Sequence, residues 1–190
     1  MPNLPTPTLL MSTLFDAFKA RAEAVSAEVH RFATRSEAID FILTFLRSLD
    51  LPRTVWAPGS LLDGVDRGRL REQAGGLTFE VTRDAAAGST IGITQLEWAI
   101  ADTGTLVTDA SPVERRLAST LPEIHIAVVA TGAILPDMPA VFARVQPERS
   151  AYLAMITGPS RTADIERVLT IGVHGPSRLV IVFVDELGRN

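Results

Sequence analysis

The sequence of 190 residues contains no cysteine. A chain without cysteine forms no disulfide, offers no thiolate nucleophile and holds no cysteine-ligated iron–sulfur cluster of its own. Lysine is nearly absent too, because Lys19, in the first helical segment, is the single lysine. The lysine of a phosphate-binding P-loop and a buried Schiff-base lysine are therefore both excluded.

Excess positive charge and long apolar runs are also missing. The net charge is −4, so no overall positive field attracts a polyphosphate backbone, and nucleic acid is not an expected partner. No segment approaches the roughly 18 consecutive apolar residues of a membrane-spanning helix. The first 15 residues lack the basic start and the apolar stretch of a signal peptide. We expect a cytoplasmic protein with no membrane partner.

What is present is the composition of a folded domain. Hydrophobic residues make up 46% of the chain and charged residues 21%, which lies outside the range of disordered chains. Residues 124–130 and 179–184 are almost entirely apolar and rich in β-branched side chains, as strands covered on both faces are. Such strands alternate with helical patterns. The sequence therefore predicts an α/β fold: a mostly parallel sheet flanked by helices, with some antiparallel strands.

The beginning of the chain has helical spacing. Apolar residues recur every three or four positions over 12–32 and again over 34–49, which predicts two amphipathic helices. Thr34 and Glu37 have the spacing of a capping box, with Ser36 as the alternative cap. We expect an N-terminal helical extension over residues 1–52 and an α/β domain over residues 53–190.

The α/β domain contains further predicted elements. A helix is expected to begin near residue 111. The signals are a cap at Ser111, a first-turn proline at Pro112 and a capping-box glutamate at Glu114. Other helices are expected over 65–74, 137–145 and 162–169, and other strands over 54–57, 77–82, 91–94, 98–101, 105–108 and 151–156, the last of these covered on both faces.

The common catalytic signatures are absent. The chain has no GxGxxG, no GxxxxGK[ST] and no GxSxG sequence. His30, His125 and His174 lack the spacing of a zinc site, and no metal site is expected. His125 lies within an apolar strand, which favours a hydrogen-bonded core histidine over a catalytic one. His174 follows the last predicted helix in a glycine-rich turn and is the best candidate for a general acid or base.

Position in the chain indicates a candidate binding loop. Thr157 to Thr162 follows a predicted strand and opens a predicted helix, where backbone N–H groups and the helix dipole favour an anion. Gly158 permits close backbone approach, Ser160 adds a hydroxyl and Arg161 a cationic fork. These features predict binding of a small carboxylate or phosphate. A capped strand-to-helix turn explains the same residues equally well.

Two further turns complete the candidate site. Asp102 to Thr105 interrupts two apolar runs, and Asp102 either moves a proton or caps the turn through its own backbone, the second being the preferred interpretation. Gly172 to Pro176 forms the other turn, just before the last strand. We expect the chain to bend at Gly104, Gly158 and Gly175, gathering three loops along one edge of a buried sheet.

The segments that carry a family resemblance are ITQLEWAIADTGTL, LPEIHIAVV, ITGPSRTADIE, IGVHGP and LVIVFVDE. Over about residues 55–186 the sequence resembles the LUD-domain family, in its lactate-utilisation protein C branch. The resemblance implies a fold similar to that of sugar-phosphate isomerases and CoA-transferase-like enzymes. It also implies a role in oxidising L-lactate to pyruvate, together with two partner proteins that carry the iron–sulfur clusters. This chain would bind no redox cofactor, so the resemblance does not establish that it is an enzyme by itself.

The positions that match the family's phrases define the candidate site. The catalytic candidates are His174 and Asp102. The ligand-binding candidates are Thr103, Gly104, Thr105, Thr157, Gly158, Pro159, Ser160, Arg161, Thr162 and Gly175, and the match also includes Asp164, Glu166, Gly172 and Pro176. Three functions stay open at this point: a subunit of a lactate-oxidising complex, a free-standing carboxylate- or phosphate-binding protein or enzyme, and an interaction module.

Overall fold

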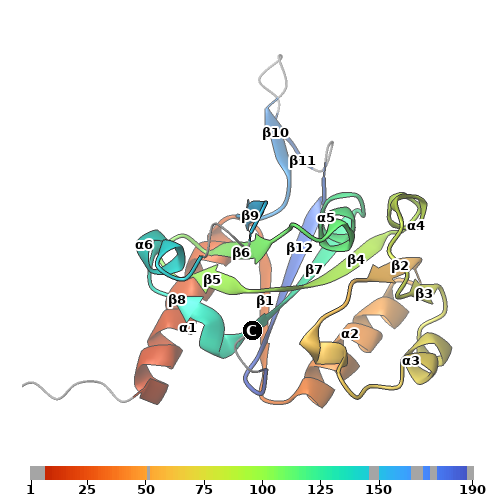
Figure 1. The fold of residues 1–190 in the computed structure, drawn as a ribbon, viewed down its shortest axis with the longest axis horizontal. Helices are drawn as coiled ribbons and strands as arrows, with labels where there is room; N and C mark the ends of the chain where they lie inside the picture. The colour runs from red at the N-terminus through yellow and green to blue at the C-terminus, as the bar shows by residue number, and fades with distance from the viewer. Residues whose placement is uncertain (1–6, 51, 146–149, 164–168, 172–174, 188–190) are drawn as a thin grey trace, which may run out of the picture.

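Strands of a large sheet alternate with helices along most of the chain in a computed structural model that describes residues 7–50, 52–145, 150–163, 169–171 and 175–187 (Figure 1). The helices are α1 (Pro7–Ala24), α2 (Arg35–Ser48), α3 (Arg67–Gln73), α4 (Arg83–Ala87), α5 (Val113–Thr120) and α6 (Met138–Phe142), with 3-10 turns at Ser60–Leu62 and Thr131–Ala133. The strands are β1 (Glu28–Phe32), β2 (Thr54–Trp56), β3 (Leu77–Thr78), β4 (Ile91–Leu96), β5 (Trp98–Ile100), β6 (Thr105–Asp109), β7 (Ile124–Ala130), β8 (Ile134–Leu135), β9 (Leu153–Ile156), β10 (Arg161–Ala163), β11 (Leu169–Ile171) and β12 (Arg178–Val184).

The main sheet has six strands in the order β1-β12-β7-β4-β2-β3, and every neighbouring pair is parallel. On one face, α1 packs Phe15 and Phe18 edge-on against Phe183 of β12, with ring centroids 5.5 and 5.1 Å apart. On the other face, Phe41 of α2 lies 5.0 Å from Phe32 of β1. Every residue of β7, in the middle of the sheet, is buried. The predicted α/β class, with its covered strands at 124–130 and 179–184, is confirmed.

The prediction of one helix over residues 12–32 is wrong at its C-terminal end. The helix α1 ends at Ala24, Ser26 adopts a left-handed φ of 70°, and residues 28–32 form the edge strand β1. Val29 and Phe32 fit a helical spacing, but pairing with β12 decides the outcome, because tertiary context overrides local pattern. The boundary at residue 52 stays a prediction, although residues 28–32 belong to the main sheet.

A smaller sheet lies beside the main one, with the strand order β8-β5-β6-β9 (Figure 1). β9 pairs with β6 in antiparallel fashion and ends this sheet, so the prediction of a strand covered on both faces at 151–156 is wrong. The predicted helix over 162–169 is wrong in its described part too, because Arg161–Ala163 pairs with Leu169–Ile171 as two antiparallel strands. Residues 77–82 form only the short strand β3 before α4 begins.

Across the described part of the chain, no helix combines the length and apolar character that crossing a lipid bilayer requires.

The predicted caps have different outcomes. Thr34 and Glu37 form the expected capping box at the start of α2. At α5 the predicted cap is wrong, because Pro112 is the N-cap residue and no side chain caps the helix. The Ser111 hydroxyl instead donates to Asp109 at 2.6 Å and accepts from the N–H groups of Ala151 and Tyr152, at 2.9 and 3.2 Å. Ser111 therefore fastens the chain that enters β9.

Replacing Ser111 by alanine is expected to lower the free energy of unfolding by about 1 to 3 kcal/mol, because three hydrogen bonds to one hydroxyl are lost. Urea denaturation measures this change, and faster hydrogen exchange of the Tyr152 amide reports loosening at β9. The control is Ser48→Ala, whose exposed hydroxyl bonds only to the Phe45 carbonyl of its own helix. Equal stability of the two variants would contradict a fastening role for Ser111.

Candidate functional site

A cavity of about 370 Å³ lies between the two sheets and the end of α5. His125 of β7 and Leu179 of β12 line it from the main sheet, and Ser119 and Thr120 line it from α5. His125 and Leu179 are each the second residue of a parallel strand. The cavity therefore lies at the amino ends of β7 and β12, whereas the sequence analysis expected a site beyond the carboxyl ends of parallel strands. The reason for this difference is that the 157–160 loop follows β9, which belongs to the smaller sheet.

The structure brings together part of the predicted site. Thr157, Gly158, Pro159, Ser160 and Gly175 all line the cavity. The Ser160 N–H donates to the Pro176 carbonyl at 2.8 Å, which joins the 157–160 loop to the 175–176 turn. The hydroxyls of Thr105 and Thr157 lie 2.8 Å apart, which links the turn before β6 to the same loop. The 157–160 loop and the 175–176 turn therefore meet at the cavity between the sheets and not along one edge of the main sheet, and the turn before β6 contacts this loop at Thr157 without lining the cavity.

Gly104 and Gly158 have a packing role that the sequence did not indicate. Both adopt a left-handed φ, of 67° and 73°, which favours glycine. A Cβ on Gly104 would lie 2.4 Å from the Ala22 nitrogen, and one on Gly158 would lie 2.6 Å from the Val25 oxygen. Both turns therefore press directly on the end of α1 and the residues that follow it.

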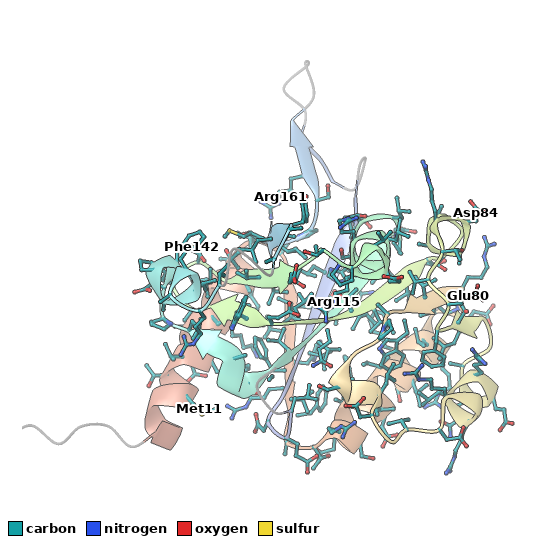
Figure 2. The ribbon with its side chains drawn as sticks, viewed as in Figure 1. Met11, Glu80, Asp84, Arg115, Phe142 and Arg161 are labelled. Carbon is teal, nitrogen blue, oxygen red and sulfur yellow. The ribbon has the colours of Figure 1, made fainter. Side chains whose placement is uncertain are left out.

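Arg161, whose side chain is labelled in Figure 2, is not among the residues that line the cavity. Its Nη2 donates to the Val25 carbonyl at 2.8 Å and lies 3.1 Å from the Ser26 hydroxyl, so the guanidinium holds the connection between α1 and β1. Thr162 lies within β10 and does not begin a helix. The helix dipole that would favour an anion is therefore absent at residues 161–163.

The remaining candidates are not part of the cavity wall or lie outside the described residues. Asp102 and Thr103 are exposed in the turn between β5 and β6, and the Asp102 N–H donates to the Pro136 carbonyl at 3.2 Å. Asp102 therefore lies in a turn, as expected, and its role there stays a prediction. His174 lies outside the described residues, as do Asp164, Glu166 and Gly172.

His125 is one of several cavity residues that the sequence did not place in the site, with Ser119, Thr120, Tyr152, Ala154, Met155, Ile156 and Leu179. Its ring is 1% exposed, and Nε2 lies 2.8 Å from the Thr94 hydroxyl of β4, which agrees with a hydrogen-bonded core histidine. Burial lowers the pKa of His125 to about 4, so the ring is neutral at neutral pH. A polar residue in each of two largely apolar strands, Thr94 and His125, was the sequence feature that could have indicated this position.

The cavity wall is polar but uncharged over its described residues. The lining residues that carry a hydroxyl are Ser119, Thr120, Tyr152, Thr157 and Ser160, and no described lining residue carries a charge apart from the titratable ring of His125. Within the described ranges, no three histidine, aspartate or glutamate side chains lie close enough together to hold a metal ion. The wall is suited to hydrogen bonding with a ligand more than to ion pairing.

Comparisons with known proteins agree on one family. A model of the LUD domain matches residues 15–184. "Lactate utilization protein C" from Exiguobacterium sp. is 37% identical over 114 residues, which are 57% of this chain and 50% of the relative. Proteins of the same name from Geobacillus sp. and Bacillus licheniformis are 35% and 34% identical, over 54% of this chain and 45% and 49% of the relatives. The chain thus spans about half the length of the curated relatives it matches.

A solved structure confirms the fold alone. A crystal structure of a DUF162 family protein from Deinococcus radiodurans superposes with a TM-score of 0.62 at 22% sequence identity. The superposition covers 92% of this chain and 98% of that one, so the similarity includes both sheets and not only the segment shared with the curated relatives.

Proposed function

The chain belongs to the LUD domain family, and from this membership we propose that it acts in the bacterial use of lactate. The observation that carries the proposal is its similarity, at 32–37% identity, to proteins named "Lactate utilization protein C". The matched segments are about half of each chain, so the activity of the whole relatives is part of the proposal.

Within lactate use, the proposed role is that of a subunit without its own redox centre. Oxidation of lactate to pyruvate removes two electrons and two protons, which an electron-accepting group must take up. Cysteine thiolates, the usual ligands of iron–sulfur clusters, are absent from this chain. The clusters that accept the electrons would therefore belong to partner proteins, and this chain would position the substrate or a partner.

A free-standing anion-binding protein has less support. That function requires a cation or a helix N-terminus at the Thr157 to Thr162 loop. Arg161 instead bonds to Val25 and Ser26, residues 161–163 form a strand, and the described cavity wall is uncharged at neutral pH. These contacts support the subunit role over an independent carboxylate or phosphate site.

Deletion of the gene in its own host is expected to prevent growth on L-lactate and to leave growth on pyruvate unchanged, because pyruvate enters metabolism after the proposed step. The measurement is growth on each carbon source alone, with the gene restored on a plasmid as the control. A tagged copy of the protein should also co-purify with iron-containing partners. Unchanged growth on L-lactate together with purification of the tagged chain alone would reject the proposal.

A further inference from the structure

The strand β9 presents an unpaired edge to the cavity. β9 pairs with β6 alone in the described sheet, in the register Thr108 with Ala154 and Val107 with Met155. The Ala110 N–H donates to the Tyr152 carbonyl at 2.8 Å, which makes Tyr152 a hydrogen-bonded position of this ladder. Hydrogen-bonded positions alternate in an antiparallel pair, so Ala154 also bonds to β6 and Met155 directs its N–H and C=O away from β6.

The cavity borders this edge. Ala154, Met155 and Ile156 are consecutive in the strand, and all three line the cavity. Ala154 and Ile156 share one face of the strand with Tyr152, which also lines the cavity, whereas the side chain of Met155 points to the other face. Met155 therefore meets the cavity at the backbone edge of the strand. The N–H and C=O of Met155 are therefore a donor and an acceptor held side by side at the cavity wall.

The opposite wall completes an uncharged site. His125 is 1% exposed and bonded to Thr94, and Ser119 and Thr120 of α5 line the same cavity. Leu179 and Pro176 add apolar surface. A carboxylate placed here would meet the Met155 carbonyl oxygen without a cation to balance its charge. An extended residue between two amide groups, whose N–H and C=O point to the same side, would bond to both edge atoms of Met155.

We propose that the cavity between β9, α5 and the amino ends of β7 and β12 binds an uncharged peptide unit, one residue between two amide groups, which pairs with Met155 as an added strand would. The volume of about 370 Å³ matches small-ligand sites, which begin at roughly 300 Å³. Such a unit occurs within an extended peptide, which adds to sheet edges in this way, and also within a small molecule that carries an amide group on each side of one carbon. This site is independent of the proposed function, because it requires neither lactate nor an iron–sulfur partner.

The test is an NMR titration of the ¹⁵N-labelled full chain with N-acetylalanine methylamide. Saturable shifts are expected at the Met155 amide, with smaller shifts at Thr157 and at the His125 ring. N-acetylproline dimethylamide keeps the carbonyls but has no N–H, and is expected to bind about tenfold more weakly, since one hydrogen bond is lost. Lactate and acetate are the anionic controls. Saturable shifts from these anions without shifts from the amide would overturn the proposal, as would the absence of shifts from all four probes.

A pair of variants tests the backbone contact directly. Met155→Pro removes the outward N–H and leaves the bonds of Ala154 to β6 in place, and proline is tolerated at such edge positions. Binding should weaken about tenfold or more in Met155→Pro and stay unchanged in Met155→Leu. Unchanged affinity in a folded Met155→Pro protein would overturn the proposal. If Met155→Pro does not fold, the comparison of the two amide probes decides the question.

One further measurement distinguishes a peptide ligand from a small molecule. A blocked hexamer of alanine and threonine that binds at least tenfold more tightly than N-acetylalanine methylamide identifies an extended peptide as the occupant. Equal affinity identifies a small amide-bearing molecule. Either result supports the amide chemistry, and neither depends on growth on lactate.

Discussion

Replacing Gly92 by alanine is expected to lower the free energy of unfolding by about 3 kcal/mol or more, an overpacking cost at the upper end of the usual range. An added Cβ would lie 1.8 Å from the Ala118 carbonyl oxygen and 2.9 Å from Pro122 Cγ, because the backbone of α5 rests directly on β4. β4 is held between β7 and β2 and has no room to shift, so α5 must move. Thermal denaturation should show a Tm lower by about 6 to 12 °C.

The matched control for this variant is Gly64→Ala. Gly64 has a left-handed φ of 73°, but no atom lies within 4 Å of an added Cβ. Alanine there introduces backbone strain alone, about 1 to 2 kcal/mol. If the Gly92 variant were no less stable than the Gly64 variant, α5 would not be seated on β4 as described. Movement of α5 would also displace Ser119 and Thr120, which form one wall of the cavity.

The second large effect is a loss of stability in mild acid caused by His125. Burial depresses the pKa of the folded-state ring to about 4, against about 6.5 in the unfolded chain. Between these two values the unfolded chain binds a proton that the folded chain does not, so stability falls as the pH is lowered. The contribution is complete above pH 6.5 and is lost progressively down to pH 4. This shift corresponds to about 3 kcal/mol.

The measurement is the free energy of unfolding in urea at several pH values from 7.5 to 4 for the native chain and for His125→Gln. Glutamine retains a hydrogen-bonding group for Thr94 but does not titrate, so its stability curve should be flatter by about 3 kcal/mol across this range. His30→Gln is the control, since His30 is only partly buried and its pKa is lowered by burial to a lesser extent. Parallel curves for the native and His125→Gln proteins would show that His125 is accessible to solvent protons in the folded state.

The elements that were predicted correctly are those whose own residues are enough to specify their structure. The strands at 124–130 and 179–184 are apolar throughout because both faces are covered, and Thr34 with Glu37 satisfies a cap that needs no distant residue. β1 could not be predicted from residues 28–32 alone, because these residues fit a helical period and only their pairing with β12 makes them a strand. The same holds for Ser111, whose hydroxyl serves residues 151 and 152 instead of the adjacent helix.

The candidate site was predicted in part. Thr157, Gly158, Pro159, Ser160 and Gly175 do share one cavity, which their glycine-rich turns indicated. The prediction of an anion site depended on the helix expected after residue 161. Residues 161–163 form the strand β10 instead. His125 was assigned to the core because its strand is apolar. Sequence pattern shows that a strand is buried, but it does not show that one end of the strand borders a cavity.

The pairing of β1 with β12 has a consequence for how the chain acquires its structure. Glu28 aligns with Val180 and Phe32 with Val184, so β1 has no sheet partner until the ribosome has synthesised nearly all of the described chain. Contacts between residues this far apart in sequence slow folding, and strands that wait for partners are prone to aggregation. We therefore expect nascent chains to stay only partly ordered until the last strand emerges, and to depend on chaperones during that interval.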